Sequence, residues 1–272
     1  MNQSLKAAVY GLAVADALGV PCEFLTRGSF EAVEMVGYGS HQQPAGTWSD
    51  DTSLVLATCD SIREKGKIDP ADMQQRFKNW LFEGVYTPDG LTFDVGNATR
   101  EALTRGHGLS DECFNGNGSL MRILPLAFTG TGPSDIEAVS SITHAHATSV
   151  EACLLYVDIA RRLLKGQQLP EILSDIETSK TYARLQTLAD LTEDDIRSSG
   201  YVVDTLEAAL WCLLTSTSYP ETVLKAVNLG DDTDTVAAVA GGLAGIIYGL
   251  EGIPDNWLSQ LRNKELLESC LF

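Results

Sequence analysis

Apolar residues recur at the three- and four-residue spacing of a helix through most of this chain. The pattern predicts helices over residues 4–18, 51–65, 98–103, 134–144, 149–164, 202–214 and 233–248. Proline at a first-turn position predicts two more, one from Pro70 through Phe82 and one from Pro254 through Leu261. We find no alternation of apolar and polar residues between tight turns, so we expect no β-sheet. The chain is therefore predicted to be all-α.

The segment 233–248 differs from the other predicted helices in its density of small residues. It contains Gly241, Gly242 and Gly245 together with several alanines. A glycine costs about 1 kcal/mol in a helix interior, so this composition suits a buried helix that its neighbours approach closely. We predict a central, buried Gly/Ala-rich helix. No linker or low-complexity segment interrupts the pattern, so residues 1–272 are expected to form a single compact multi-helix domain.

The charge balance narrows the class of partner. The 272 residues include 19 basic and 37 acidic side chains, which gives a net charge of -18. Such a chain repels nucleic acid and anionic membranes on average and attracts cations. We see no signal peptide and no run of about 18 apolar residues. The six cysteines form no CxxC pair, which favours buried free thiols over disulfides. We therefore expect a cytoplasmic protein that does not bind membranes.

Two short clusters of carboxylates each stand where a Gly-rich loop ends and a helix begins. One spans residues 48–52 (Trp-Ser-Asp-Asp-Thr) and the other spans residues 230–235 (Gly-Asp-Asp-Thr-Asp-Thr). A helix N-cap is the simpler interpretation, and for the first cluster alone it is favoured. A cap needs one acceptor, however, whereas the second cluster supplies three carboxylates that repel one another without cations. Oxygen ligands select hard ions, so the two clusters together predict a site for two divalent cations, Mg²⁺ or Mn²⁺.

Other features have both a structural and a functional interpretation. The Gly-rich loop at residues 115–119 suits a bound diphosphate, but an ordinary turn followed by Arg122 in a salt bridge is favoured on these residues alone. His144 and His146 cannot share a helix face, and one capping and one solvated histidine would explain them. The segment 93–97 (Phe-Asp-Val-Gly-Asn), which contains Asp94, is also explained as a simple N-cap. Glu23 has apolar neighbours in the sequence, so it is either a surface residue or a carboxylate with a raised pKa.

Taken together and in order, these motifs resemble the ADP-ribosylglycohydrolase family, in particular bacterial members similar to dinitrogenase reductase-activating glycohydrolase. The resemblance covers nearly the whole chain. It rests on Asp16-Ala17-Leu18-Gly19 with Glu23, Trp48-Ser49-Asp50-Asp51-Thr52, Phe93-Asp94-Val95-Gly96-Asn97, Asn117-Gly118-Ser119-Leu120-Met121-Arg122, Thr143-His144, Gly200-Tyr201-Val202-Val203 and Asp232-Thr233-Asp234-Thr235. Each motif alone is weak, but seven in this order are specific.

The resemblance implies an all-α hydrolase that holds two Mg²⁺ or Mn²⁺ ions and cleaves a glycosidic bond to ADP-ribose. The metal ligands that it implies are Ser49, Asp50, Asp51, Asp232, Asp234 and Thr235. It places Asp94 at the reacting ribose and matches Glu23 to a glutamate that gates or binds a metal, so either carboxylate is expected to act as the catalytic proton carrier. The substrate contacts that it implies are Asn117, Gly118, Ser119, Met121, His144, His146 and Tyr201. Asp231 stands where many relatives have glycine.

The expected substrate is a protein or small molecule that carries ADP-ribose, and nucleic acid is an unlikely partner. Arginine is favoured as the acceptor because the motifs at 48–51 and 200–203 look most like the arginine-type bacterial branch, and because an acidic chain favours a cationic leaving group. Two alternatives are open at this point. A two-metal phosphoesterase or pyrophosphatase would use the same clusters but release AMP. A non-catalytic ADP-ribose binder is less favoured, because neither cluster has lost a ligand-type residue.

Overall fold

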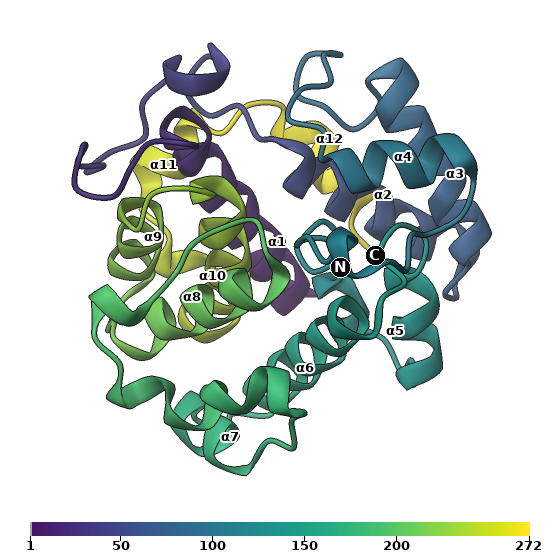
Figure 1. The fold of residues 1–272 in the computed structure, drawn as a ribbon. Coiled ribbons are helices and arrows are strands. Elements are labelled where there is room, and N and C mark those ends of the chain that lie inside the picture. The colour runs from purple at the N-terminus through teal and green to yellow at the C-terminus, as the bar shows by residue number, and fades with distance from the viewer. Residues whose placement is uncertain (1) are drawn as a thin grey trace.

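The computed structural model describes residues 2–272, which fold into helices around one hydrophobic core (Figure 1). Its α-helices are α1 (Gln3–Gly19), α2 (Asp50–Lys65), α3 (Pro70–Glu83), α4 (Asn97–Arg105), α5 (Pro133–Ser140), α6 (Ala147–Leu164), α7 (Leu169–Asp175), α8 (Val202–Leu214), α9 (Tyr219–Asn228), α10 (Thr233–Tyr248), α11 (Asp255–Gln260) and α12 (Lys264–Cys270). Across these described residues no β-sheet forms, and extended segments meet in isolated bridges such as Gly116–Tyr201. The predicted all-α fold is confirmed.

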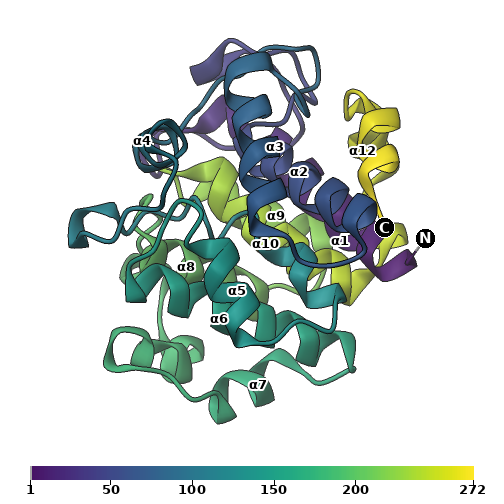
Figure 2. The same cartoon turned by 90° about the vertical axis from the view of Figure 1, so that its right-hand side faces the viewer.

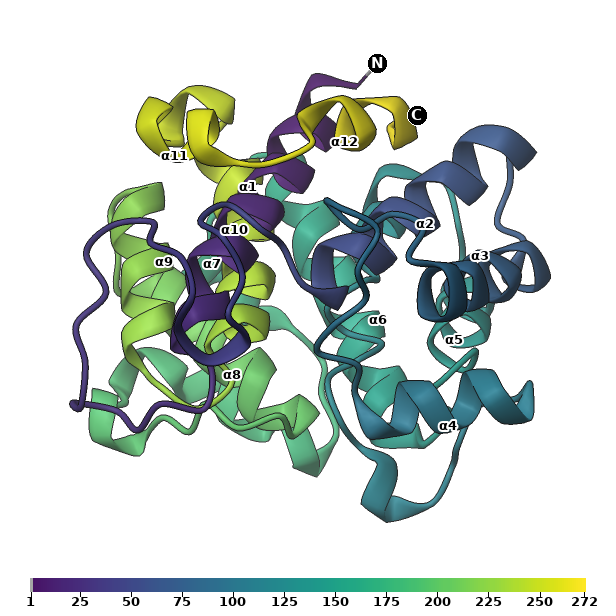
Figure 3. The same ribbon diagram turned by 90° about the horizontal axis from the view of Figure 1, so that it is seen from above.

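The chain is organised around α1 and α10, which lie side by side at the centre of the molecule (Figures 1 and 3). Small residues make this contact. A Cβ added at Gly11 would lie 2.4 Å from the carbonyl oxygen of Gly241. Near the end of α1, a Cβ added at Gly19 would lie 2.4 Å from the Cα of Asp234. The two helices therefore touch backbone to backbone, and the first turn of α10 is held against the last turn of α1.

The helix α10 is buried over most of its length, as its composition predicts. Every residue from Thr233 to Gly245 is buried. Besides α1, it packs against α9, α8, α6 and α2. Larger side chains would keep these helices apart, whereas glycine and alanine let several of them converge on one axis. The prediction of a central Gly/Ala-rich helix is confirmed.

Some helix boundaries differ from the predicted ones because tertiary contacts decide them. The helix predicted over 134–144 ends at Ser140. The backbone that follows turns to pair with Leu109, whose N–H donates to Thr143 at 3.0 Å and whose carbonyl accepts from Ala145 at 2.8 Å. The helical segments of 7 or more residues that the sequence pattern did not predict are Leu169–Asp175, Lys180–Asp190, Tyr219–Asn228 and Lys264–Cys270.

The last helix, α12, closes the structure against the first (Figures 2 and 3). The Nζ of Lys6 donates to Oε1 of Glu268 at 2.6 Å, and the Tyr10 hydroxyl donates to the same oxygen at 2.9 Å. These contacts join the two ends of the chain on one side of the molecule.

Two features bear on the expected cell compartment. The stretch Gln3–Cys22 is long and apolar enough to cross a membrane, but 94% of its apolar window is buried inside the protein. It is therefore the core helix of a globular domain. All six cysteines are free thiols, and all except Cys113 are buried. The burial and the free thiols agree with the sequence analysis, and the cytoplasmic location stays a prediction.

Gly241→Ala is expected to destabilise the protein, although alanine is the better helix former. The added methyl would lie 2.5 Å from the Gly11 carbonyl oxygen and from the Ala15 Cβ. The helices α1 and α10 would have to separate, which costs about 1–3 kcal/mol and lowers Tm by roughly 2–10 °C. Thermal unfolding followed by circular dichroism measures this. Gly130→Ala is the matched control, because a Cβ there meets nothing within 4 Å. Equal Tm values for the two variants would contradict the backbone contact.

Candidate active site

The two acidic clusters predicted from the sequence meet in one place. Ser49 caps α2 through its Oγ, which also donates to Oδ2 of Asp51 at 3.0 Å. The hydroxyl of Thr235, 184 residues further along the chain, donates to the same oxygen at 3.3 Å. The helix cap and the acidic cluster considered from the sequence are therefore both present, and Ser49 belongs to each of them. We call this group the carboxylate floor; it consists of Ser49, Asp50, Asp51, Asp232, Asp234 and Thr235.

Asp16 fixes the start of α2 from its place on α1, a role that the sequence analysis did not assign. Its carboxylate accepts the backbone N–H of Ser49 at 2.9 Å and that of Thr52 at 3.0 Å. Burial raises the pKa of Asp16 to about 6, although these hydrogen bonds favour its charged form. Its carboxylate oxygens lie within 4.8 Å of those of Asp51 and Asp234. The motif at 16–19 was visible in the sequence, but its contact with α2 was not.

Several oxygens of the carboxylate floor lack a hydrogen-bond partner within residues 2–272. They are Oδ1 of Asp51, Oδ1 of Asp232 and Oδ2 of Asp234. Burial, reinforced by neighbouring carboxylates, raises the pKa of Asp51 and of Asp234 well above the usual range. Buried anionic oxygens without partners are unfavourable unless a cation compensates them. The floor is thus a buried acidic cluster with the oxygen donors that hard divalent cations take.

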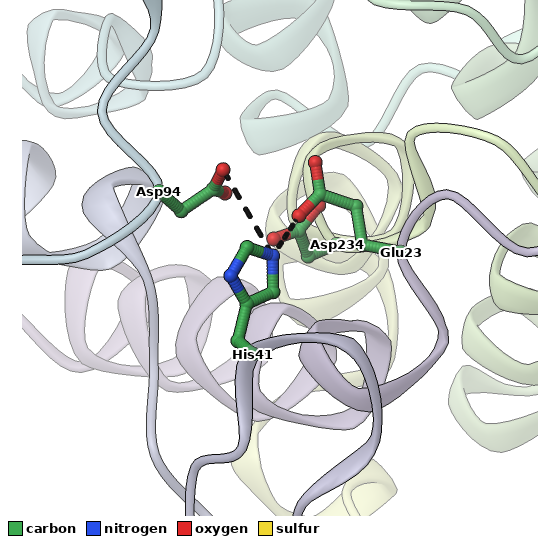
Figure 4. Close-up of side chains that lie close together, drawn as sticks. All are labelled: Glu23, His41, Asp94 and Asp234. Carbon is green, nitrogen blue, oxygen red and sulfur yellow. Dashed lines mark hydrogen bonds and ion pairs between the residues drawn. The ribbon is translucent and has the colours of Figure 1, made fainter.

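Glu23 and Asp94, the two predicted catalytic carboxylates, face His41 beside the floor (Figure 4). The Nε2 of His41 contacts Oε2 of Glu23 and lies 3.9 Å from Oδ1 of Asp94. Burial raises the pKa of Glu23 to about 7, and the hydrogen bond with His41 opposes this rise. Glu23 is therefore a buried group with a raised pKa and not a surface residue. Asp94 does not cap α4, whose N-cap residue is Gly96.

His41 reaches the site from the Gly-rich loop before α2, and the sequence analysis did not identify it. The loop packs tightly, since a Cβ added at Gly39 would lie 2.0 Å from the carbonyl oxygen of Pro21. The hydrogen bond with Glu23 raises the pKa of His41 above its ordinary value. Potential ligand atoms of Glu23, His41, Asp94 and Asp234 all lie within 4.8 Å of one another. A single histidine in a loop has no periodic pattern that could have revealed this contact.

A cavity of about 460 Å³ opens above the floor. Carboxylates from Glu23, Asp50, Asp94 and Asp232 line it, together with the loop at 116–118, Met121 and His144. Asn117 joins the loop to the floor, because its Nδ2 donates to Oδ2 of Asp232 at 2.9 Å. Gly118 leaves room in the wall, since a Cβ there would lie 2.9 Å from Cε1 of His144. The predicted loop and the acidic clusters therefore face one cavity.

His144 is buried and uncharged at the cavity wall. Burial, reinforced by the nearby charge of Arg122, lowers its pKa to about 3, so the alternative of a solvated histidine is wrong. The Thr143 hydroxyl accepts from Arg122 at 2.9 Å and lies 2.8 Å from Nδ1 of His144. The hydroxyl hydrogen is then free to donate to Nδ1, which leaves the imidazole proton on Nε2. His144 can therefore donate a hydrogen bond into the cavity without carrying a charge.

Arg122 is fully buried behind the loop without an acidic partner. Within the residues that the structure describes it forms no ion pair, and its Nε and Nη1 have no hydrogen-bond acceptor. Its guanidinium stacks 4.5 Å from the centre of the Phe77 ring. Burial lowers its pKa to about 10. The salt bridge considered from the sequence is therefore absent among residues 2–272, and the cation contributes positive potential beneath the loop.

Three predicted substrate contacts do not line the cavity. Ser119 is fully buried, and its hydroxyl accepts from Ser140 at 3.0 Å. His146 caps α6 through Nδ1, as the structural interpretation expected. Tyr201 is 43% exposed at the start of α8 and pairs with Gly116, so it lies beside the loop at the surface. The remaining predicted contacts, Asn117, Gly118, Met121 and His144, all face the cavity.

Comparison with known proteins agrees with this geometry. The family model described as ADP-ribosylglycohydrolase matches residues 2–271. The chain is 38% identical to ADP-ribosylarginine hydrolase Tri1 of Pseudomonas putida (strain GB-1), with 94% of this chain and 73% of that protein covered. It is 33% identical to ADP-ribosyl-[dinitrogen reductase] glycohydrolase of Rhodospirillum rubrum, with 94% and 90% covered.

A solved structure supports the same relationship. The structure titled "ADP-ribosylglycohydrolase-related protein complex" superposes with a TM-score of 0.82 at 33% identity and covers 98% of this chain and 95% of its own. The shared fold, the match along the whole chain and the hydrolases among its relatives agree with the acidic cavity described above. The chain belongs to the ADP-ribosylglycohydrolase family of glycosidic-bond hydrolases.

Proposed function

We propose that this protein hydrolyses the bond between ADP-ribose and the guanidinium nitrogen of an arginine on a modified protein. The observation that carries the proposal is the cavity itself. Its acidic part holds Glu23 and Asp94 beside the carboxylate floor, and its other part holds the glycine loop with an uncharged His144. The name of the Pseudomonas putida relative, an ADP-ribosylarginine hydrolase, supports arginine as the acceptor, and the name of the Rhodospirillum rubrum relative supports a modified protein as the substrate.

The carboxylate floor would hold two divalent cations, Mg²⁺ or Mn²⁺. The candidate ligands are Ser49, Asp50, Asp51, Asp232, Asp234 and Thr235. Two observations support more than one ion. Several of these buried oxygens have no partner, and Asp234 belongs to two groups of possible ligands, one with Asp16 and Asp51 and the other with Glu23, His41 and Asp94. The chemistry supplied by such ions would be that of Lewis acids, which polarise oxygen ligands and stabilise developing negative charge.

The loop part of the cavity would bind the rest of ADP-ribose. The backbone N–H of Gly118 offers a hydrogen bond to the diphosphate, and a Cβ at Gly118 would fill this space. The Nδ2 hydrogens of Asn117 already go to Thr205 and Asp232, so Asn117 offers its Oδ1 as an acceptor for a hydroxyl of the adjoining ribose. His144 donates from Nε2, and Arg122 beneath it supplies positive potential that favours an anion. Tyr201 lies beside the loop, where the adenosine would extend.

Glu23 or Asp94 would move the proton that the reaction requires. A general base works best with a pKa near the working pH, and the pKa of Glu23 is raised to about 7 by burial. The carboxylate would accept a proton from the attacking water and return one to the departing nitrogen. A guanidine leaves as a neutral molecule after one proton transfer, whereas a serine alkoxide needs more assistance from a general acid. Cleavage at arginine therefore requires less acid catalysis from Glu23 or Asp94.

Product analysis tests the proposal. The protein is incubated with an arginine-linked ADP-ribosyl peptide and Mn²⁺, and the products are separated by chromatography. We expect intact ADP-ribose and unmodified arginine. Release of AMP would instead indicate the phosphoesterase alternative. Tight binding of ADP-ribose with no product would indicate a binding module.

Asp234→Asn is expected to lower kcat/KM at least about a hundredfold and to weaken binding of Mn²⁺ measured by calorimetry, because a metal ligand stabilises the transition state by several kcal/mol. Excess EDTA should abolish turnover of the parent. Asp231→Asn is the matched control: its side chain is exposed, and its φ of 59° is left-handed, which asparagine tolerates. An Asp234→Asn variant as active as this control would contradict the assignment.

Without metal, the protein is expected to lose stability as the pH rises. Asp16 and Glu23 titrate at about 6 and about 7 when folded, above their ordinary values of 3.8 and 4.5. Between these values the folded state binds more protons than the unfolded state, so the free energy of unfolding falls from about pH 4 to about pH 7. Calorimetry in EDTA should show a lower Tm at pH ~7.5 than at pH ~5, and Mn²⁺ should reduce that difference. An unchanged difference with Mn²⁺ would argue against ion binding at the floor.

Arginine-linked ADP-ribose is expected to be cleaved at a kcat/KM roughly tenfold or more above that of a serine-linked peptide of matched sequence, because the guanidine is the easier leaving group. Rates are compared side by side under identical metal conditions. A faster reaction on the serine-linked peptide would reverse the acceptor preference and leave the family membership unchanged.

A further inference from the structure

Phe24 is a large apolar side chain that the core does not use. It is 69% exposed and lines the cavity next to Glu23. Its φ is 64°, in the left-handed region that side chains other than glycine rarely adopt. A residue held in such a conformation at the mouth of a cavity suggests a functional reason for its position.

The conformation of Phe24 is fixed by the start of α10. Its backbone N–H donates to the carbonyl of Asp231 at 2.7 Å, and the N–H of Asp231 donates to the carbonyl of Leu25 at 2.9 Å. Asp231 is itself left-handed, which explains why glycine would also suit that position. These two hydrogen bonds tie the backbone of Phe24 to the segment that carries Asp232 and Asp234, so the point from which the ring projects is fixed relative to the carboxylate floor.

The ring of Phe24 lies on the same side of the cavity as the catalytic carboxylates. Its centroid is 5.9 Å from that of His41, and the His41 ring is 5.3 Å from that of Phe93. His41 in turn contacts Glu23 and lies 3.9 Å from Asp94. Phe24 therefore lies on the side of the cavity that Glu23 and Asp94 line, where the acceptor would leave ADP-ribose.

The charge on this side favours a cation. No lysine or arginine lines the cavity in the part of the chain that the structure describes. The carboxylates that surround the cavity and its floor are Asp16, Glu23, Asp50, Asp51, Asp94, Asp232 and Asp234. Two divalent cations would neutralise four of these seven charges. An aromatic face beside excess negative charge attracts a cation, and a planar guanidinium can stack on the ring while it donates hydrogen bonds to carboxylates.

We propose that Phe24, with Glu23 and Asp94, forms the subsite for the acceptor and selects an arginine guanidinium by stacking. The proposal rests on the arginine hydrolysis proposed above and adds to it a residue that determines specificity. Phe24 does not contact the ADP-ribose part of the substrate, so its loss changes acceptor preference and leaves ADP-ribose affinity unaltered.

Phe24→Leu tests this role with the least disturbance, since leucine keeps a side chain at the same unfavourable φ and removes only the aromatic face. We expect kcat/KM for an arginine-linked peptide to fall about threefold to thirtyfold, the range of a cation–π contact. The rate on a serine-linked peptide and the Kd for free ADP-ribose with Mn²⁺ should stay within about twofold. Phe24→Tyr should retain the arginine rate, because the ring is kept.

Phe82→Leu is the matched control, because Phe82 is also exposed, at 66%, and lies on α3 away from the cavity. It should match the parent in every assay. A second measurement does not depend on turnover: calorimetric titration of Nα-acetyl-argininamide into the complex with Mn²⁺ and ADP-ribose. We expect Phe24→Leu to raise this Kd about threefold to thirtyfold.

Two results would overturn the proposal. Equal loss on both peptides with weaker ADP-ribose binding would place Phe24 in the ADP-ribose site. Parent-like arginine rates and argininamide Kd in Phe24→Leu would show that the ring does not contact the acceptor. If the parent releases no ADP-ribose from an arginine-linked peptide, the proposed function fails, and the argininamide titration still decides whether Phe24 binds a guanidinium.

Discussion

The backbone contact between α1 and α10 positions the carboxylates of the candidate active site. Glycines at positions 11, 19 and 241 let the helices approach until a single added Cβ would strike the partner's backbone. This approach places Asp16, on α1, beside Asp234, in the first turn of α10. Asp16 then accepts the backbone N–H groups that begin α2. One close helix pair thus brings three helix segments, and the carboxylates that they carry, to one point.

The cavity combines two opposite electrostatic environments. Its floor gathers buried carboxylates whose charged forms are destabilised by burial and by one another. Its loop side has an uncharged imidazole at His144, with the buried cation of Arg122 behind it. The first environment attracts cations, and the second favours an anionic group without placing a full charge in the cavity. A substrate with a diphosphate at one end and a cationic acceptor at the other matches both.

In such a site, the requirements of stability and of function conflict. Packing carboxylates together in a buried place is unfavourable in the free protein, and the core must stabilise the fold enough to tolerate it. The residues that hold the arrangement are therefore as important as those that react. Asp16 anchors α2, Thr143 orients His144, and the backbone of Asp231 holds Phe24. Neither Thr143 nor Asp231 supplies a group that the proposed chemistry uses directly.

The all-α class, the buried Gly/Ala-rich helix and both acidic clusters could be predicted from the sequence, because each is a local pattern of periodicity, composition or helix capping. The family motifs extended this to Glu23, Asp94 and the loop at 117–118. Three features of the site appear only in the folded protein: Asp16 accepts the backbone N–H groups that begin α2, His41 lies between Glu23 and Asp94, and Ser119 and His146 do not line the cavity. The tertiary structure also ended α5 at Ser140, because Leu109 pairs with the residues that follow. These outcomes depend on contacts between residues distant in the chain, which a local pattern does not encode.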